Sequence, residues 1–507
     1  MTILRLLAFQ THALPTVPTP DIVAVGIVYF VVCAAIAVWA ARRTHTASDF
    51  FVAGGGIGLW TMALAAMAAT LSGFIFIGGP GLLYSYGIGA LFISLSASIT
   101  TPLSAWALAR RMRLLREVRG LMTVPDAIGA RYRSPAAQGL SAVAILVASV
   151  GYIAANLLAL GWVVDAIFHT GLDTGIIAGA AVVIAYSATG GMLAGVYTDL
   201  FQGAIKTFAS VGIFITVLHT GGGMGGISRA ILAREPAFLG PWGVLPPLAA
   251  LSYFFVFGLG TLGQPQVITK YYMLKDPRQL RWYPLLMTVV LILTLLLFFS
   301  VGIGVKAAVL NGTLAPLAAS RADDATPMFL LHQTAPLLAG IVFSGIAAAI
   351  MGTVNAFMSV GAAAVTHDLP VAFGRPVPGE LGLGRISTLV IGVLATLLAL
   401  RSGQLVVFLG IAGWGLFAST LVPALAIGLN WTGATRAGAI ASMAVGLAFT
   451  LTFESLSWFK VYKFPTGVQN AGASLVLSLL VFLVVSWLTR RHADGELDAD
   501  VRLIMEK

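Results

Sequence analysis

Long apolar runs dominate this sequence and decide what it can fold into. A helix that crosses a bilayer needs about 20 mostly apolar residues, since each residue rises only about 1.5 Å along the axis. By that measure the sequence holds about thirteen candidate spans, and the longest has room for a tilted or broken helix plus an interfacial piece. They cover approximately 22–41, 58–84, 88–110, 137–166, 174–190, 194–219, 244–272, 283–306, 327–366, 384–400, 404–430, 435–453 and 468–489. The sequence therefore predicts an all-α polytopic membrane protein.

Composition excludes several other classes of protein. Of the 507 residues, 58% are hydrophobic and 9% are charged, whereas a soluble domain carries about 25% charged residues. The single cysteine, Cys33, rules out a disulfide framework. The histidines show no metal-ligand spacing, and neither a nucleophile elbow nor a phosphate loop is present, so we predict that the protein is not an enzyme.

The net charge of +10 is typical of nucleic-acid binding, but the positions of the basic residues argue for a membrane protein without a nucleic-acid partner. Positive residues gather in cytoplasmic loops of such proteins. If the N-terminus lies outside and the C-terminus inside, most lysines and arginines fall inside, and an odd number of helices permits this arrangement. The two main clusters are Arg110, Arg111, Arg113, Arg116, Arg119, Arg131 and Arg133, and then Lys270, Lys275, Arg278 and Arg281.

Two of the predicted helices contain residues that interrupt a helix. The first carries Ser72-Gly73 and then Gly78-Gly79-Pro80-Gly81, and the second carries FGLGTLGQPQ around Pro265. Glycine and proline are also common in ordinary membrane helices. Breaks in corresponding helices of two halves, however, point to a transporter built from inverted repeats. We expect repeats at 58–220 and 242–430, preceded by an N-terminal helix with its following loop (1–57) and followed by two helices and a short tail (431–507).

Asp199 lies in the stretch YSATGGMLAGVYTDLFQ (186–202), which is otherwise almost free of charge. A carboxylate inside a membrane normally faces a cavity or a partner. The alternative is that Asp199 caps a helix end within reach of water. Lys206 lies about 10 Å further along the same helix face, too far for a direct pair, so we expect it to reach the interface or another helix.

This stretch resembles the signature of the sodium:solute symporter family. Further resemblance lies in SDFFVAGGGIG (48–58), where Gly56 replaces the usual arginine, and in Thr123-Val124-Pro125-Asp126 followed by Arg131-Tyr132. It covers roughly residues 45–430. It implies the five-plus-five inverted-repeat fold, with discontinuous second and seventh helices and three extra helices. The signature positions matched are Thr189, Gly190, Gly191, Ala194, Thr198, Asp199 and Gln202.

The resemblance also implies a sodium site between the broken helix 2 and helix 9. Its ligands would be the carbonyls of Ala68 and Leu71 together with Ala349, Gly352 and Thr353, and Asp199 is a second coupling candidate. Gly352 lacks the hydroxyl that the family pattern places there. Water or Asn355 could fill the gap; otherwise sodium binds weakly or a proton drives transport.

A substrate site is expected between the two helix breaks. Amides beside Ser72 and Gly73 could bind a carboxylate, as helix N-termini do. Phe257 and Thr261 stand where the family's proline permeases carry tryptophan and tyrosine, which argues against proline, whereas FIGGPGLLYSYGIG (76–89) is similar to the pantothenate branch. The expected substrate residues are Thr70, Ser72, Gly73, Asn156, Phe257, Thr261, Gln264, Pro265 and Trp414, although Asn156 and Trp414 are equally compatible with ordinary packing.

These observations predict a secondary active transporter of a bacterial cytoplasmic (inner) membrane. It would import a small organic solute, such as a carboxylate, an amino acid or a pantothenate-like compound, together with sodium by alternating access. A proton-coupled symporter of the same fold is the main alternative, and a membrane solute sensor is another. The expected partners are the solute, sodium and the lipid bilayer, without an organic cofactor, and the protein could be a monomer or a homo-oligomer.

Overall fold

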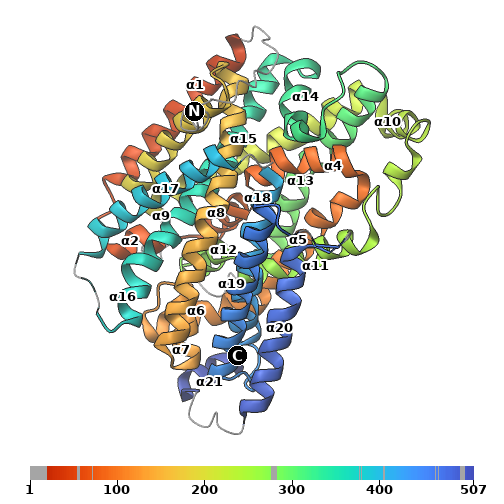
Figure 1. The fold of residues 1–507 in the computed structure, drawn as a ribbon. Coiled ribbons are helices and arrows are strands. Elements are labelled where there is room, and N and C mark those ends of the chain that lie inside the picture. Colours follow the sequence, from red (N-terminus) through yellow and green to blue (C-terminus); the bar gives the residue numbers. More distant parts are fainter. Residues whose placement is uncertain are drawn as a thin grey trace, which may run out of the picture.

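The computed structural model describes residues 20–53, 57–70, 72–275, 282–375, 377, 379–402, 406–462, 464–465, 468–490 and 497–506. Within these residues, twelve helical segments are long and apolar enough to cross a membrane. They run side by side as a helical bundle (Figure 1). The all-α membrane fold predicted from the sequence is confirmed.

The long helices are α1 (Pro20–Ala41), α8 (Pro135–Phe168), α9 (Leu172–Thr220), α11 (Pro247–Gly260), α13 (Tyr283–Leu310), α15 (Pro336–Ala363), α17 (Glu380–Arg401), α18 (Val406–Leu421), α19 (Arg436–Trp458) and α20 (Asn470–Thr489). The shorter helices are α2 (Ala47–Val52), α3 (Leu59–Thr70), α4 (Gly79–Tyr86), α5 (Leu91–Ser104), α6 (Arg110–Arg119), α7 (Val124–Tyr132), α10 (Gly223–Leu232), α12 (Pro265–Tyr271), α14 (Ala325–Gln333), α16 (Leu369–Ala372) and α21 (Ala499–Glu506).

The number of spans depends on how the broken helices are counted. Helix α3 has 12 residues, which is shorter than a full span. The continuous stretch Phe74–Arg119 counts once, although Gly87 divides it with a φ of +75°. The expected run 327–366 separates into α14 and α15. The count of thirteen and the inverted repeat remain predictions.

The first predicted break is present, but it is smaller than the glycine pattern suggested. Helix α3 ends at Thr70, Ser72 is non-helical and the helix resumes at Gly73. The prediction that Gly78–Gly81 interrupt the same helix again is wrong. A π-helix, Phe74–Gly78, leads directly into α4, so Pro80 lies inside a continuous helix. The Phe76 carbonyl, four residues before Pro80, accepts from the Thr326 hydroxyl at 2.7 Å, which compensates for the missing backbone N–H of the proline.

The break predicted around Pro265, in the second interrupted helix, is confirmed. Helix α11 ends at Gly260, a 3₁₀ turn covers Thr261–Gly263, and Gln264 is extended with φ −79° and ψ 103°. Helix α12 begins at the next residue, Pro265. Proline at the first helical position needs no hydrogen-bond partner for its nitrogen, so this residue restarts the helix rather than ending it.

The Gly-Gly pair of the signature produces a kink inside α9. Gly191 has φ 53° and ψ −146°, a conformation almost confined to glycine. A Cβ at this position would also lie 2.7 Å from the carbonyl oxygen of Phe50 in α2. Asn355 of α15 donates to the Gly191 carbonyl at 3.1 Å, so two neighbouring helices fix the kink.

Two other family-like motifs form helix N-caps. In α2, Thr46 accepts from the amide of Asp49 while the Asp49 carboxylate accepts from the Thr46 amide. Thr123 and Asp126 make the same reciprocal pair at the start of α7. Such a capping box satisfies amides that a helix start leaves without partners. These motifs therefore define where α2 and α7 begin.

Arg131 is not the solvated loop charge that its sequence neighbours suggested. Its side chain is 1% exposed, and its guanidinium donates to the carbonyls of Gly428, Trp431 and Ala434 at 2.7–3.2 Å. The Tyr132 hydroxyl donates to the Ala424 carbonyl at 2.8 Å. The Arg-Tyr pair therefore holds the carbonyl end of the helix that follows α18.

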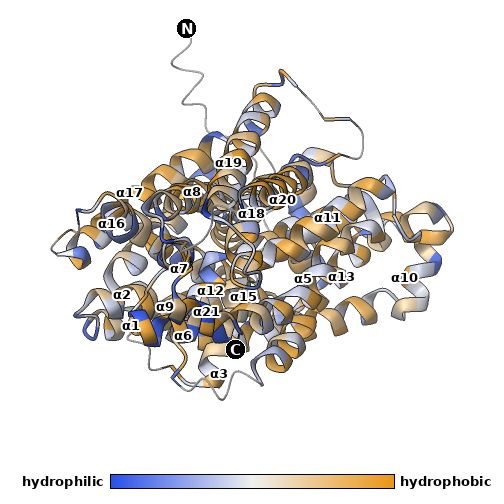
Figure 2. Ribbon diagram, turned by 90° about the horizontal axis from the view of Figure 1, so that it is seen from below, coloured by the Kyte–Doolittle hydropathy of each residue, from blue (hydrophilic) through white to orange (hydrophobic). Residues whose placement is uncertain are grey.

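The C-terminal helix α21 lies against α6, so the arginine-rich segment and the tail share one face. Arg119 pairs with Asp498 at 2.7 Å and with Asp500 at 2.6 Å. These hydrogen bonds lower the pKa of Asp500 below its usual value. Figure 2 shows hydrophilic residues gathered on this face, around α6 and α21. This fits the prediction that both segments are cytoplasmic, while the orientation of the termini remains a prediction.

The kink in α9 provides a test of the fold. Gly191→Ala should lower the free energy of unfolding by about 1–3 kcal/mol, because the backbone conformation is strained for alanine. Thermal unfolding in detergent measures this loss. Gly151→Ala in α8 is the matched control, since a Cβ there meets no atom within 4 Å. Equal melting temperatures for the two variants would contradict the assigned kink.

Candidate functional site

A buried ion pair lies at the centre of the bundle, where α3, α9, α12 and α15 meet. Asp199 Oδ2 of α9 and Lys270 Nζ of α12 are 2.9 Å apart, and both side chains are 1% exposed or less. Asp199 lies well inside α9, so it does not cap a helix end. The assignment of Lys270 to a cytoplasmic loop is wrong, because the break at Gln264 turns the short helix α12 into the interior.

Two lysines donate to carbonyls near the C-terminal end of α3. Lys270 Nζ donates to Ala65 at 2.6 Å and Lys206 Nζ donates to Ala68 at 3.1 Å. The last four carbonyls of a helix lack partners within it, and they carry the negative end of the helix dipole. The Lys206 ammonium group satisfies both needs at Ala68, whereas Ala65, the acceptor of Lys270, lies before these last four residues of α3. Lys206 therefore meets another helix, one of the two outcomes expected for it.

Gly352 allows Asp199 to reach this position. A Cβ at residue 352 would lie 2.1 Å from Asp199 Oδ1 and 3.1 Å from Gln202 Oε1. A serine or threonine cannot occupy residue 352 while Asp199 stays where it is. Glycine at residue 352, where the family pattern has a hydroxyl residue, thus leaves the space that the Asp199 carboxylate fills.

The residues expected to hold sodium do not form a complete oxygen site. The Ala68 carbonyl already accepts from Lys206, and the Ala349 carbonyl accepts from the Thr353 hydroxyl at 2.9 Å. Leu71 lies outside the described residues. Asn355 donates to Gly191 through Nδ2, and its Oδ1 is buried without a hydrogen-bond partner among the described residues. A sodium ion needs several oxygens free of other donors and cations, and this arrangement does not fit that requirement as it stands.

A shell of polar side chains surrounds the carboxylate. Gln202 Nε2 donates to the Tyr29 hydroxyl at 3.1 Å, and the Tyr186 and Thr198 hydroxyls hydrogen-bond each other. Among the described residues, Asp199 Oδ1 and Gln202 Oε1 are buried without a hydrogen-bond partner. Buried acceptors without donors are costly, so these oxygens can accept a further donor or cation.

The break after α3 is anchored to α8. The Ser72 and Tyr152 hydroxyls are 3.0 Å apart, and the Gly73 amide donates to Asn156 Oδ1 at 3.0 Å. The Gly73 amide is therefore not free to bind a carboxylate, contrary to expectation. A ligand at this break would have to replace Asn156 or use other donors.

Aromatic rings fill the space between the two breaks. Phe257 stacks on Phe74 at 5.3 Å and on Trp414 at 5.4 Å between ring centroids. The indole N–H of Trp414 is buried and has no hydrogen-bond partner among the described residues. Thr261 donates to the Phe257 carbonyl, and its hydroxyl accepts from Thr100 at 3.3 Å.

The remaining predicted substrate residues lie at the same break or outside the description. Gln264 is fully buried and donates to the Gly260 carbonyl at 3.3 Å, and Pro265 opens α12 beside it. The side chain of Thr70 is not among those described. The structure therefore brings Phe257, Thr261 and Trp414 together, with Ser72 and Asn156 on the facing helices.

A cavity of about 530 Å³ lies between α1 and α9, next to the polar shell of Asp199, because Tyr186 belongs to both. Most of its lining is apolar, including Cys33, Val38, Val182 and Met351, and Arg42 and Thr189 are among its polar residues. Burying a carboxylate or ammonium group without partners is costly, so this cavity suits a hydrocarbon chain better than a polar solute. The candidate substrate site remains the aromatic region between the breaks.

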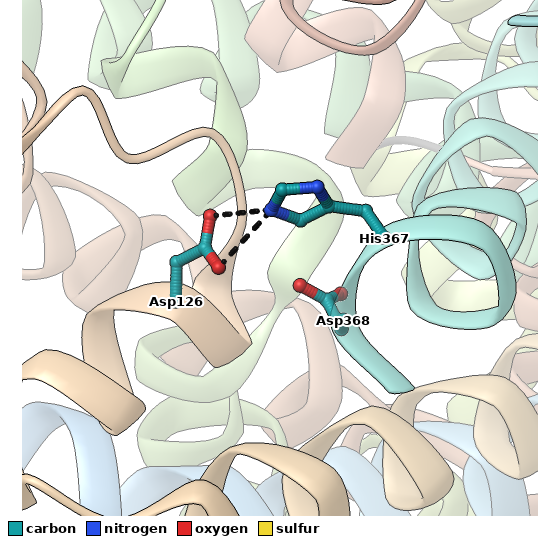
Figure 3. A group of neighbouring side chains, drawn as sticks. All are labelled: Asp126, His367 and Asp368. Atoms are coloured by element: carbon teal, nitrogen blue, oxygen red, sulfur yellow. Dashed lines mark hydrogen bonds and ion pairs between the residues drawn. The ribbon is translucent and has the colours of Figure 1, made fainter. Parts of the chain in front are cut away.

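Asp126, His367 and Asp368 form a separate polar cluster that joins α7 to the end of α15 (Figure 3). His367 faces Asp126 through Nε2 at 3.2 Å and Glu380 through Nδ1 at 3.1 Å. Asp126 also accepts from Gln138 at 2.9 Å and from the backbone amides of its own cap. An imidazole that donates from both nitrogens has no lone pair for a metal, so this cluster is an ion network that links helices.

Comparison with known proteins agrees with this architecture. The model of the sodium:solute symporter family matches residues 50–446. The osmoregulated proline transporter OpuE of Bacillus subtilis (strain 168) is 30% identical over 501 residues, covering 96% of this chain and 98% of the relative. The sodium/pantothenate symporter of Escherichia coli (strain K12) is 26% identical over 469 residues, covering 90% of this chain and 94% of the relative.

A solved structure shares the fold. A Na⁺-coupled sialic acid symporter, described in a substrate-bound outward-open state, superposes with a TM-score of 0.76 at 17% identity, covering 93% of this chain and 98% of that chain. The likeness shows the fold, and the family match over residues 50–446 together with the 30% identical relative defines a polytopic membrane transporter. The chain belongs to the sodium:solute symporter family.

Sequence reasoning missed the ion pair because it assigned Lys270 to a basic loop cluster. A signal was present: Lys270 follows Gln264-Pro265 by fewer than two helical turns. A lysine that close to a membrane break can lie at the depth of the break. The partner on α9 could not be identified, because nothing in the sequence shows which helices meet.

The ion pair predicts a specific pattern of stability. Asp199→Asn leaves Lys270 buried without a counter-charge, which should cost about 3–5 kcal/mol of unfolding free energy. The double variant Asp199→Asn/Lys270→Met should recover much of the lost melting temperature, because it removes both charges. Asp500→Asn, whose partner Arg119 is at the surface, is the control and should change little. A single variant as stable as the native protein would contradict the pairing.

Proposed function

We propose that this protein imports a small organic solute bearing a carboxylate by alternating access, driven by an inward cation gradient. Membership of the sodium:solute symporter family supports the transport class. Relatives described as a proline transporter and a pantothenate symporter support the solute class, since proline and pantothenate share a carboxylate. The solute site is the aromatic region between the α3–α4 break and the α11–α12 break.

The observation that carries the solute site is the unpartnered indole N–H of Trp414. It is a buried hydrogen-bond donor within a stack that includes Phe74 from one broken helix and Phe257 from the other. A buried donor without an acceptor costs free energy, and an acceptor on a bound solute would remove that cost. The flanking rings match the apolar part of such a solute.

The coupling ion has two candidates. Family membership supports sodium. A specific observation favours a proton as the second candidate: two buried lysines, Lys206 and Lys270, lie beside Asp199 at the C-terminal end of α3, and the hydroxyl of the family pattern is missing at Gly352. A carrier that moves protons needs buried groups that can gain and lose them, and such groups within a membrane mark ion pathways.

The solute site is tested by Trp414→Phe, which keeps an aromatic ring and removes the N–H. The solute concentration for half-maximal uptake should rise about tenfold, as expected for the loss of a buried hydrogen bond. Uptake by proteoliposomes is measured for amino acids, pantothenate and other small carboxylates. Trp487→Phe on α20, where Trp487 is 71% exposed, is the control and should behave as the native protein. Unchanged affinity in Trp414→Phe would remove Trp414 from the site.

The coupling ion is tested by imposing one gradient at a time on the same proteoliposomes. Accumulation driven by sodium at equal pH on both sides would identify sodium coupling. Accumulation driven by a pH gradient in choline chloride would identify proton coupling. No accumulation of any tested solute under either gradient, with protein that is folded, would contradict a symport function.

A further inference from the structure

The ammonium group of Lys206 lies against a carbonyl oxygen that was expected to bind sodium. Lys206 is 1% exposed, and its ammonium group donates to the Ala68 carbonyl at 3.1 Å. That carbonyl belongs to the last turn of α3 and is the first oxygen expected to bind sodium. An N–H···O bond of this length places positive charge directly against the oxygen.

The charges around Lys206 leave an excess of one positive charge. Asp199 is paired with Lys270, and Lys206 lies within electrostatic range of both. Among the described residues, the other ionisable side chains of the polar shell around Asp199 are Tyr29 and Cys33 of α1 and Tyr186 of α9. With both lysines protonated and the phenols and the thiol neutral, two ammonium groups share one carboxylate. A sodium ion would be a third cation in a region of low dielectric, where repulsion between like charges is large.

Helix α15, which faces α3 across the expected sodium site, also differs from a sodium-binding arrangement. Helix α15 presents Gly352 rather than a hydroxyl, and Asp199 occupies the space that a larger side chain would need. The Thr353 hydroxyl donates to Ala349 on its own helix. One hydroxyl is thus missing on α15, at Gly352, while a cation is already present against α3. Both features weaken the binding of a sodium ion between α3 and α15.

We propose that the Lys206 ammonium is a tethered cation that competes with sodium for the Ala68 carbonyl. This inference rests on the proposed cation-coupled transport, and it assigns the binding site between α3 and α15 to a side chain. The hydrogen bond from Lys206 to Ala68 links α9 to α3, as an ion bound between the two helices would. Sodium and the ammonium group exclude each other at this oxygen, so the native protein responds weakly to sodium at this site.

The test is sodium binding by the purified protein, which does not depend on transport or on a known solute. Thermal unfolding is followed in sodium chloride and in choline chloride at equal ionic strength and fixed pH. A ligand that binds the folded state raises the melting temperature. Lys206→Met, which keeps the length of the side chain without its charge, should reach half-maximal stabilisation at a sodium concentration about tenfold lower than the native protein, or lower still.

Two controls and a second neutral variant define the outcome. Lys206→Arg keeps a cation at the site and should respond to sodium as weakly as the native protein. Lys306→Met removes a lysine of α13 that pairs with Glu235 instead of Asp199, and its sodium dependence should also match that of the native protein. Lys206→Gln, neutral but still polar, provides a second test of charge removal if the methionine variant does not fold.

Tighter sodium binding in Lys206→Met or Lys206→Gln, with no change in Lys306→Met, would support the tethered cation. Equal sodium dependence in the native protein and in a folded neutral variant would overturn it. That result would leave the proposed transport function intact. Conversely, a failure of solute uptake in proteoliposomes would leave the sodium comparison valid, so the two proposals fail separately.

Discussion

A membrane helix that stops inside a protein leaves carbonyl groups that water cannot reach, and α3 is such a helix. It ends at Thr70, and each unsatisfied carbonyl in a membrane costs several kcal/mol. Lys206 supplies a donor to Ala68, one of these last carbonyls, and Lys270 donates to Ala65 just before them. Their charge must be balanced, and the carboxylate of Asp199 provides that balance. The interrupted helix thus accounts for the charges at the centre of the bundle.

Other features follow from placing a carboxylate at this depth. Gly352 leaves the space for Asp199, and the extended Gln264 directs α12 so that Lys270 arrives opposite. The kink at Gly191, supported by Asn355, divides the helix that carries Asp199. A single substitution in this group changes the cost of the others, because the interactions are buried and few alternative partners exist.

The aromatic region that we propose as the solute site lies between the same two helix breaks. It combines rings from both broken helices with Trp414 of α18, so its shape depends on how those helices lie relative to each other. Conversion between outward-open and inward-open states would change that arrangement. A solute that bridges the rings and a cation that orders α3 against α15 would then be coupled through one element, and the coupling free energy is reciprocal.

The sequence by itself determined the all-α membrane fold, the break near Ser72, the break around Pro265 and the separation of the spans 174–190 and 194–219, between which Gly191 kinks α9. These follow from apolar run length and from the backbone properties of glycine and proline, which act within a few residues. It also identified Asp199 as a buried acid. Only the tertiary structure decided that Lys270 pairs with Asp199, that Lys206 occupies the Ala68 carbonyl and that Gly352 makes room for the carboxylate. Those contacts join residues that are 71, 138 and 153 positions apart, and their partners are set by which helices pack together.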